Sequence, residues 1–266
     1  MAETEVTRGY RATWSPDALA GRVCVVTGAS GGIGLEATRA LASVGGQVFA
    51  LTRNPDRLTE RLGGGLAGVR PVKADASRPD DVRAALAQAA ELSGKIDVAV
   101  ANAGQHTSCP FGEMPVESWR AEFEVNVHGA FVLFQSCLPH VPSGGSLIAV
   151  GSVSGVRGAG KGKVAYGATK AALNGFIAGL ARELGPQGIR ANVIAPGAVQ
   201  GTEMADAVVA SVSAESFAAG SFLGRAGDVW EAAHGVLYLA TEASSYVTGS
   251  VLRVDGGSLF RDRVGG

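Results

Sequence analysis

Two side chains four residues apart offer the chemistry of proton transfer. Tyr166 and Lys170 begin and end the segment Tyr-Gly-Ala-Thr-Lys, and on a helix they would share one face. A free tyrosine has a pKa of about 10; a nearby ammonium lowers that pKa, whereas burial raises it. Such a phenol could donate a proton to a carbonyl oxygen as hydride reaches the carbon. The alternative is an ordinary helix face that carries an aromatic ring and a solvated lysine.

A glycine-rich segment upstream indicates what would supply the hydride. Residues 27–34 read Thr-Gly-Ala-Ser-Gly-Gly-Ile-Gly, and Gly28, Gly32 and Gly34 stand between a buried apolar run and a helical pattern. Glycine lets the backbone approach a ligand closely, and the N-terminus of a helix presents N–H groups and a partial positive charge to a pyrophosphate. We therefore expect a dinucleotide site, with a ligand-free turn as the alternative. The spacing differs from the Gly-x-Gly-x-x-Gly of the dehydrogenase fingerprint.

The end of the second strand should distinguish NADP from NAD. An acidic residue there would accept hydrogen bonds from the ribose 2′-OH of NAD. This chain has Leu-Thr-Arg-Asn at 51–54, and Arg53 could hold a 2′-phosphate with two parallel donors. We expect NADP(H) to be favoured over NAD(H), with a solvated arginine at a strand end as the alternative. Gly31 occupies a position where a second basic residue would have strengthened this expectation.

These residues need a scaffold, and the chain alternates strand and helix patterns. Strands are expected at 22–27, 47–52, 69–73, 96–101, 145–150, 191–194 and 249–254, and helices at 33–44, 80–92, 117–138, 164–184 and 229–240. This order predicts an α/β fold: a single-domain, Rossmann-type, doubly wound parallel sheet with helices on both faces. Ligands of such sheets bind at the carboxyl ends of the strands.

Two segments stand outside this alternation. Residues 1–20 are expected to form an N-terminal extension, pinned by Trp14, before a catalytic domain at residues 21–266. Residues 199–224 lack periodicity, and we expect a mobile segment over the site there. Met204, Phe217 and Phe222 would form its apolar cover or pack in the core.

Composition argues against several kinds of partner. The net charge is −1 over 266 residues, which disfavours nucleic-acid binding. No apolar run approaches the roughly 20 residues that span a bilayer, and the polar N-terminus lacks the order of a signal peptide, so we expect a cytoplasmic protein without a membrane segment. We expect buried reduced thiols, structural or surface histidines and no metal; the residues concerned are Cys24, Cys109, Cys137, His106, His128, His140 and His234.

Further motifs occur in order with the two above. They are Asn102-Ala103-Gly104, Asn126, Ser152 and Pro196-Gly197. Together with the glycine-rich segment and the Tyr-x-x-x-Lys pair, these motifs make the chain resemble the short-chain dehydrogenase/reductase family from about residue 21 to residue 257. Within that family the chain resembles the 3-oxoacyl reductases. The resemblance implies an enzyme that transfers a hydride between a nicotinamide cofactor and a ketone or secondary alcohol.

The resemblance also implies a role for each matching residue. Tyr166 would exchange the proton, Lys170 would lower the pKa of Tyr166 and bind the nicotinamide ribose, and Ser152 would hydrogen-bond the substrate oxygen. Asn126 would hold a water in a proton relay to Lys170. The other expected cofactor residues are Gly28, Ser30, Gly32, Ile33 and Gly34 in the turn, Arg53, Asp75, Ala76, Asn102, Ala103 and Gly104 along the adenosine half, and Pro196, Gly197, Val199 and Thr202 around the nicotinamide.

Three of these residues have a second interpretation. Ser154 could take the place of Ser152, because both lie in one Gly-Ser-Val-Ser-Gly segment. Asn126 could simply bend a helix, and Asp75 could cap the helix that begins near residue 78. The interval from Pro196 to Thr202 is one residue longer than in many relatives, which leaves the role of Thr202 open.

The interval from Ser152 to Tyr166 is also one residue longer than in many relatives. The loop within this interval carries Arg157, Lys161 and Lys163. These cations could meet an acidic carrier protein or an anionic substrate, or they could be solvated. We expect a ketone reductase that uses NADPH. The alternatives are an NAD-dependent alcohol, polyol or steroid dehydrogenase of the same family, and a non-catalytic dinucleotide-sensing scaffold.

The helix expected at 164–184 carries small residues that would allow another helix to approach closely. They are Ala168, Ala171, Ala172, Gly175, Ala178 and Gly179. Packing within one chain would account for them nearly as well. The family resemblance implies a homo-oligomer, either a tetramer or a dimer.

Overall fold

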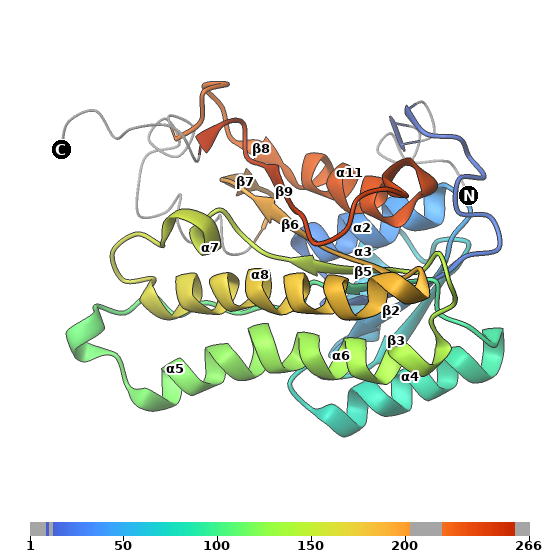
Figure 1. The fold of residues 1–266 in the computed structure, drawn as a ribbon, viewed down its shortest axis with the longest axis horizontal. Coiled ribbons are helices and arrows are strands. Elements are labelled where there is room, and N and C mark those ends of the chain that lie inside the picture. Colours follow the sequence, from blue (N-terminus) through green and yellow to red (C-terminus); the bar gives the residue numbers. More distant parts are fainter. Residues whose placement is uncertain (1–8, 11–12, 203–219, 259–266) are drawn as a thin grey trace.

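The computed structural model of the chain describes residues 9–10, 13–202 and 220–258, and a parallel sheet lies at its centre (Figure 1). Within these residues the sheet has seven strands in the order β3-β2-β1-β4-β5-β6-β9. They are β1 (Val23–Thr27), β2 (Gln47–Thr52), β3 (Val69–Lys73), β4 (Val98–Ala101), β5 (Ser146–Val150), β6 (Arg190–Pro196) and β9 (Val251–Val254). Every neighbouring pair is parallel, so the carboxyl ends of the strands meet at one edge. The strand order reverses between β1 and β4, which is where ligands of such sheets bind.

Helices cover both faces of the sheet, as the sequence predicts. One face carries α4 (Pro79–Ser93), α6 (Gly129–Cys137) and α8 (Val164–Leu184), and α5 (Val116–Phe123) extends α6. The other face carries α2 (Gly32–Ser43), α3 (Pro55–Arg61) and α11 (Val229–Ala240). Figure 1 shows α6 and α8 side by side below the sheet, and α2 and α11 above it.

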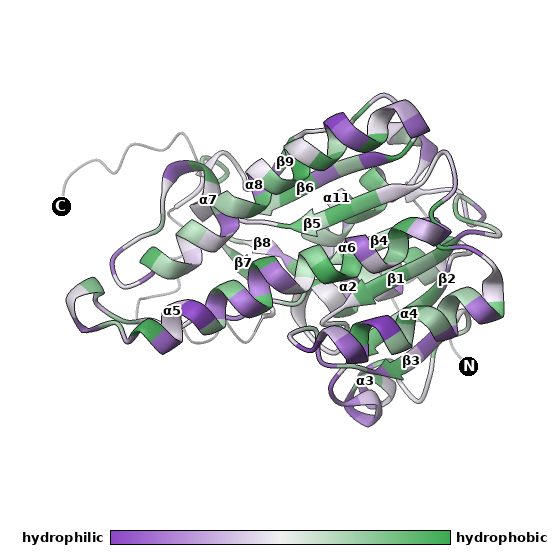
Figure 2. Ribbon diagram, turned by 60° about the horizontal axis from the view of Figure 1, so that its bottom comes forward, coloured by the Kyte–Doolittle hydropathy of each residue, from purple (hydrophilic) through white to green (hydrophobic). Residues whose placement is uncertain are grey.

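The central strands contribute to two apolar cores, one on each face. Along β1, Val23 and Val25 pack under α4 and α6, whereas Cys24 and Val26 pack under α2 and α11. Successive side chains of a strand point to opposite faces, so a strand covered on both sides must be apolar throughout. Figure 2 shows this difference: the central strands are green along their length, and the covering helices also carry purple residues.

The segment before β1 is tied to the body of the protein. Tyr10 and Leu19 are buried in the core under α2 and α11. The indole Nε1 of Trp14 donates a 3.0 Å hydrogen bond to Nδ1 of His234 on α11. Trp14 therefore pins this segment, as expected from the sequence.

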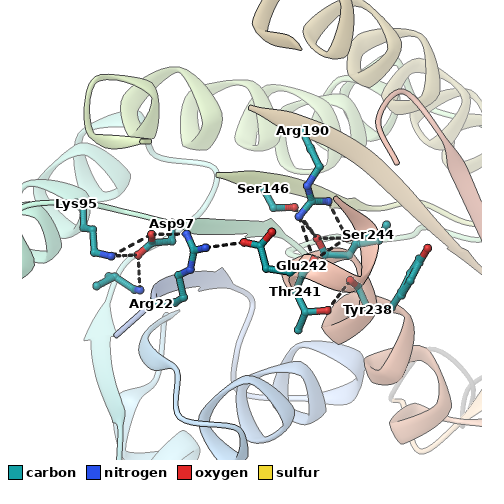
Figure 3. Close-up of polar contacts among 11 residues, drawn as sticks. Arg22, Lys95, Asp97, Ser146, Arg190, Tyr238, Thr241, Glu242 and Ser244 are labelled. Atoms are coloured by element: carbon teal, nitrogen blue, oxygen red, sulfur yellow. Dashed lines mark hydrogen bonds and ion pairs between the residues drawn. The ribbon is translucent and has the colours of Figure 1, made fainter. Parts of the chain in front are cut away.

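A network of polar side chains lies at the amino-terminal ends of the strands, opposite the carboxyl ends (Figure 3). Asp97, just before β4, accepts hydrogen bonds from Arg22 at 3.0 Å, from Lys95 and from the backbone N–H of Val23 at 2.8 Å. Arg22 also bridges to Glu242, which follows α11. The network joins the starts of β1 and β4 to the C-terminal end of α11.

Beside it, Arg190 at the start of β6 is also buried. Its guanidinium donates to the hydroxyl of Ser244 at 2.8 Å and to the carbonyl of Leu239 at 2.9 Å. The same Leu239 carbonyl accepts from Ser146 at the start of β5. Figure 3 shows these side chains converging from the strands onto the end of α11.

The structure adds elements that the sequence patterns do not predict. Helix α3 begins after Asn54, whose side chain accepts from the N–H of Arg57. The expected helix at 117–138 has a π-helical turn, η2 (Glu124–His128), between α5 and α6. A short helix, α7 (Ser154–Arg157), follows β5, and β7 (Val199–Gln200) pairs with β8 (Gly227–Asp228).

Two expectations about single residues, the buried thiols and the apolar cover, have different outcomes. Cys24 and Cys137 are buried free thiols, whereas Cys109 is only half-buried. Phe222 is exposed, and Met204 and Phe217 lie outside the described residues.

None of the helices in the described ranges combines the length and the apolar character that crossing a bilayer requires.

Candidate active site

A cavity of about 580 Å³ opens at the carboxyl ends of the strands. Nearly every residue that the sequence assigns to the site lines it; these are Gly28, Ser30, Gly32, Ile33, Arg53, Asp75, Ala76, Asn102, Ala103, Gly104, Ser152, Tyr166, Lys170, Pro196, Gly197, Val199 and Thr202. Gly34 and Asn126 are not on its wall. Both lie directly behind it and hold wall residues in place.

The glycine-rich turn (residues 27–34) depends on the absence of side chains. Gly28 has φ +64°, and a Cβ there would lie 2.9 Å from Cα of Ala103. A Cβ at Gly34 would collide with the carbonyl oxygen of Gly28 and with the amide of Asn102. Helix α2 starts at Gly32 with no acidic residue in its first turn, so its positive end faces the cavity without a nearby carboxylate. This arrangement can bind a pyrophosphate.

Asn102 and Thr27 brace the turn. The side-chain amide of Asn102 donates to the carbonyls of Thr27 at 3.0 Å and Gly28 at 3.1 Å. The hydroxyl of Thr27 accepts from the backbone N–H groups of Asn102 and Ala103. The ends of β1 and β4 are thus locked together at the point where the strand order reverses.

Cations gather at the end of β2. Arg53 lines the cavity there, and Arg57 reaches it from α3. Arg61, one helical turn further, donates a 3.1 Å hydrogen bond to the carbonyl of Ser30 in the glycine-rich turn. Arg61 therefore places a basic side chain beside Gly31, where the sequence itself has none. It comes from α3, a helix that the sequence patterns do not predict.

Asp75 also lines this end of the cavity. Burial raises the pKa of its carboxyl, but hydrogen bonds from the hydroxyl and N–H of Ser77, with the charges of Arg53 and Arg78, outweigh burial and lower that pKa. Helix α4 has Arg78 at its N-cap and no side-chain cap, so the alternative that Asp75 caps this helix is wrong.

The proton-transfer pair lies at the other end of the cavity. Tyr166 and Lys170 are on α8, and Nζ of Lys170 lies 5.7 Å from the centre of the Tyr166 ring. This ammonium is buried, with the side chain only 4% exposed, and donates a 2.7 Å hydrogen bond to the carbonyl of Val150 at the end of β5. Burial lowers the pKa of Lys170 to about 8.

Ser152 is the serine beside Tyr166. Burial raises the pKa of the phenol, a hydrogen bond with Ser152 opposes this change, and the carboxyl of Glu122 adds to it. Because burial outweighs the other effects, the phenol keeps its proton at neutral pH, as a proton donor must. The hydroxyl of Ser152 also accepts from the N–H of Ser154 at 3.1 Å, so Ser154 supports Ser152 through its backbone.

Asn126 occupies the π-helical turn and does more than bend the helix. Its side chain accepts from the N–H of Gln105 at 2.8 Å and donates to the carbonyl of Gln105 and the hydroxyl of Thr169, each at 3.0 Å. Thr169 precedes Lys170 on α8. Asn126 therefore fixes both the loop after β4 and the helix that carries the proton-transfer pair.

Several residues of the cavity wall are not predicted by the sequence motifs. They include Arg57, Gln105 and His106, whereas Arg157 and Lys163, which the sequence offers as cations for an anionic substrate, also line the wall. His106, interpreted from the sequence as a structural or surface residue, lies on the cavity wall with its ring 5.3 Å from that of Tyr166. Its place two residues after Gly104, in the loop that follows a strand end, is a signal that would have identified it.

Comparisons with known proteins identify the family of the chain. A family model described as enoyl-(acyl carrier protein) reductase matches residues 28–258. The 3-oxoacyl-(acyl-carrier-protein) reductase FabG of Thermotoga maritima is 34% identical over 244 residues, which cover 90% of this chain and 98% of that protein.

Solved structures are similar over almost the same length. A short-chain dehydrogenase/reductase from Brucella melitensis, described as a glucose/ribitol dehydrogenase, superimposes with a TM-score of 0.86 at 30% identity and covers 92% of this chain and 99% of its own. A blue fluorescent protein from a metagenomic library, in complex with NADPH, has a TM-score of 0.83 at 35% identity, with coverages of 91% and 99%. The chain is therefore an oxidoreductase that belongs to the NAD(P)-binding short-chain dehydrogenase/reductase family.

Proposed function

We propose that this protein is an NADP(H)-dependent ketone reductase in which Tyr166, Lys170, Ser152 and Asn126 form the catalytic group. The observation that carries the proposal is the position of the Tyr166 phenol. It lies beside Ser152 and Lys170 and shares one cavity with the glycine-rich turn. A proton donor and a dinucleotide site therefore face the same space.

Each residue has a defined task in this proposal. When bound, the nicotinamide supplies the hydride. The hydroxyl of Ser152 and the phenol of Tyr166 hold the carbonyl oxygen, and the phenol donates its proton to that oxygen. The ammonium of Lys170 stabilises the resulting phenolate, and Asn126 holds the loop and the helix that keep these groups in place.

The cofactor would lie across the sheet from β2 to β5. The pyrophosphate would bind at Gly28, Ser30, Gly32 and Ile33, with Gly34 allowing the turn to close. The adenosine half would meet Asp75, Ala76, Asn102, Ala103 and Gly104, and the nicotinamide half Tyr166, Lys170, Pro196, Gly197, Val199 and Thr202. A Cβ on Gly32 would lie 3.1 Å from Cγ2 of Thr202, which supports a place for Thr202 above the turn.

NADP(H) is proposed over NAD(H) because two arginines line the cavity where the 2′-phosphate would be. Arg53 follows β2 directly, and Arg57 is four residues further, on α3. A guanidinium binds phosphate with parallel donors, and two of them favour the phosphorylated cofactor. The similar structure that contains NADPH is consistent with this choice.

We also propose an organisation for the whole chain: an extension at residues 1–20 and a catalytic domain at 21–266 that assembles as a homo-oligomer. On α8, Ala171, Gly175, Ala178 and Gly179 are not buried, and a Cβ at either glycine would meet no atom within 4 Å. Packing within the described chain therefore does not account for these small residues, and a second copy of α8 would. Light scattering should show a dimer or tetramer; a monomer of 26.8 kDa would refute this part.

The function is tested by following NADPH absorbance with a panel of ketones. The panel contains 3-oxoacyl thioesters, cyclic ketones and keto sugars, each assayed with NADPH and with NADH. The proposal expects ketone-dependent oxidation of NADPH that is faster than that of NADH. Oxidation of alcohols with NAD⁺ and no reduction of any ketone would contradict it.

A further inference from the structure

The cavity wall carries more positive charge than binding of the cofactor and proton transfer would use. Among the described residues, the cavity wall carries five cationic side chains and one carboxylate, Asp75; the cations are Arg53, Arg57, Arg157, Lys163 and Lys170. Arg53 and Arg57 would hold the 2′-phosphate, and Lys170 belongs to the catalytic group. Arg157 and Lys163 have no assigned task.

These two cations lie far from the phosphates of the cofactor. Arg53 follows β2, whereas Arg157 and Lys163 follow β5, and β1 and β4 separate these strands in the sheet. Three strand spacings amount to about 14 Å. The pyrophosphate would bind after β1 and the 2′-phosphate after β2, so no phosphate of the cofactor would reach the β5 side.

The surroundings of Lys163 make its charge effective. Lys163 is the N-cap of α8, a 21-residue helix with no acidic residue in its first turn, so the positive end of the helix adds to the ammonium. Within the described residues, no carboxylate forms an ion pair with Lys163. Lys163 also precedes Tyr166 by three residues, and both line the same cavity.

Arg157 is a second cation at this end of the cavity. It donates a 2.8 Å hydrogen bond to the carbonyl of Ser258, which positions the guanidinium without neutralising it. His106 is half-buried, and burial and the charge of Lys163 lower the pKa of its imidazole, so the ring beside Tyr166 favours its neutral form and the positive charge comes from Lys163 and Arg157. Glu122 is the carboxyl that interacts with Tyr166; it is fully buried and held by the N–H of Thr107.

We propose that Lys163 and Arg157 form a subsite for an anionic group of the substrate, so that the enzyme reduces small ketones carrying a carboxylate or a phosphate near the carbonyl. This inference rests on the proposed function, because it assumes that the ketone lies against Tyr166. An acyl thioester on a carrier protein would have its charges outside the cavity, whereas these cations are on its wall.

Binding measured without turnover tests the subsite directly. Calorimetry in the presence of NADP⁺ compares levulinate with methyl levulinate, and dihydroxyacetone phosphate with dihydroxyacetone, so that each pair differs in one anionic group. The wild type should bind one of the anionic ketones about 10-fold to 100-fold more tightly than its neutral counterpart. The pair that shows the larger ratio identifies whether the subsite binds a carboxylate or a phosphate.

Variants then assign this ratio to the named residues. Lys163→Gln and Arg157→Gln should each reduce the ratio at least several-fold, and Lys163→Arg should restore it. Lys161→Gln is the matched control, because Lys161 is exposed, lies two residues away and does not line the cavity. A ratio near one in the wild type, or an equal loss in Lys161→Gln and Lys163→Gln, would overturn the inference.

The same proteins separate this inference from the proposed function. NADPH oxidation with the four ketones reports the reductase activity. Reduction of neutral and anionic ketones with equal kcat/KM and no preference in binding would reject the subsite and leave the reductase intact. Selective anion binding without reduction of any ketone would reject the reductase and leave the subsite.

Discussion

The ammonium of Lys170 lies 5.7 Å from the centre of the Tyr166 ring and is held there by the carbonyl of Val150, at 2.7 Å. Both groups are on α8, and the carbonyl comes from the end of β5, so the sheet itself fixes the pair. Burial moves the pKa of Lys170 down to about 8 and that of Tyr166 up. The free protein therefore contains a phenol that keeps its proton and a lysine that titrates close to neutrality.

The buried lysine should be visible in the dependence of stability on pH. The pKa of Lys170 is about 8 when folded and 10.5 ordinarily, so between these values the unfolded chain binds more protons. The free energy of unfolding of the wild type should therefore rise relative to Lys170→Met as pH increases from 8 to 10, by about 1–3 kcal/mol. Urea unfolding at three pH values measures this difference. A difference that is constant with pH would show that Lys170 is not buried as a cation.

The glycine-rich turn should not tolerate a single methyl group at Gly34. In Gly34→Ala the Cβ meets the carbonyl of Gly28 and the amide of Asn102, so the turn must open. We expect a loss of stability of about 1–3 kcal/mol and weaker NADPH binding. The matched control is Gly185→Ala, at an exposed position where a Cβ meets nothing within 4 Å. NADPH affinity by fluorescence titration is the measurement, and equal affinity in both variants would contradict the account.

Charge reversal at the end of β2 should change the preferred cofactor. Arg53→Asp removes one donor pair for a 2′-phosphate and places a carboxylate where the 2′-OH of NAD(H) could donate to it. The ratio of kcat/KM for NADPH to that for NADH should fall about 10-fold to 100-fold. Arg83→Asp carries the same charge change on α4, away from the cavity, and should leave the ratio unaltered. An unchanged ratio in Arg53→Asp would exclude Arg53 as the selector.

The network at the opposite edge should affect stability without affecting the cofactor site. Asp97, with a side chain only 1% exposed, accepts from Arg22, Lys95 and the N–H of Val23. Asp97→Asn should lower the free energy of unfolding by about 1–3 kcal/mol, because Arg22 and Lys95 would lose the buried charge that they share. Asp80→Asn, which breaks an exposed pair with Arg83, should cost less than about 1 kcal/mol. Comparable losses in the two variants would argue against the network.

The sheet could be predicted from the sequence because its central strands are buried on both faces. Runs such as 23–27 are apolar throughout, and in a chain that alternates with helical patterns such a run indicates a central parallel strand. The site motifs were also sufficient to bring Tyr166, Ser152 and the glycine-rich turn to one cavity. Ser152 and the turn each follow a strand end, and Tyr166 lies in the first turn of α8.

Contacts between distant segments could not be predicted in the same way. Helix α3 is only seven residues long, and its value to the site, through Arg57 and Arg61, depends on how it folds back onto the turn. The position of His106 against Tyr166 results from the path of a loop, which carries no periodic pattern. The sign of the change in the pKa of Tyr166 depends on burial, which no motif specifies.

If the phenol of Tyr166 is the proton donor, Tyr166→Phe should bind the cofactor but lose turnover. NADPH affinity and the rate of NADPH oxidation are measured on the same preparation, with whichever ketone the wild type reduces fastest. We expect unchanged NADPH affinity and a rate that falls about 10²-fold to 10⁴-fold. A variant that binds NADPH and reduces the ketone within about tenfold of the wild-type rate would contradict it.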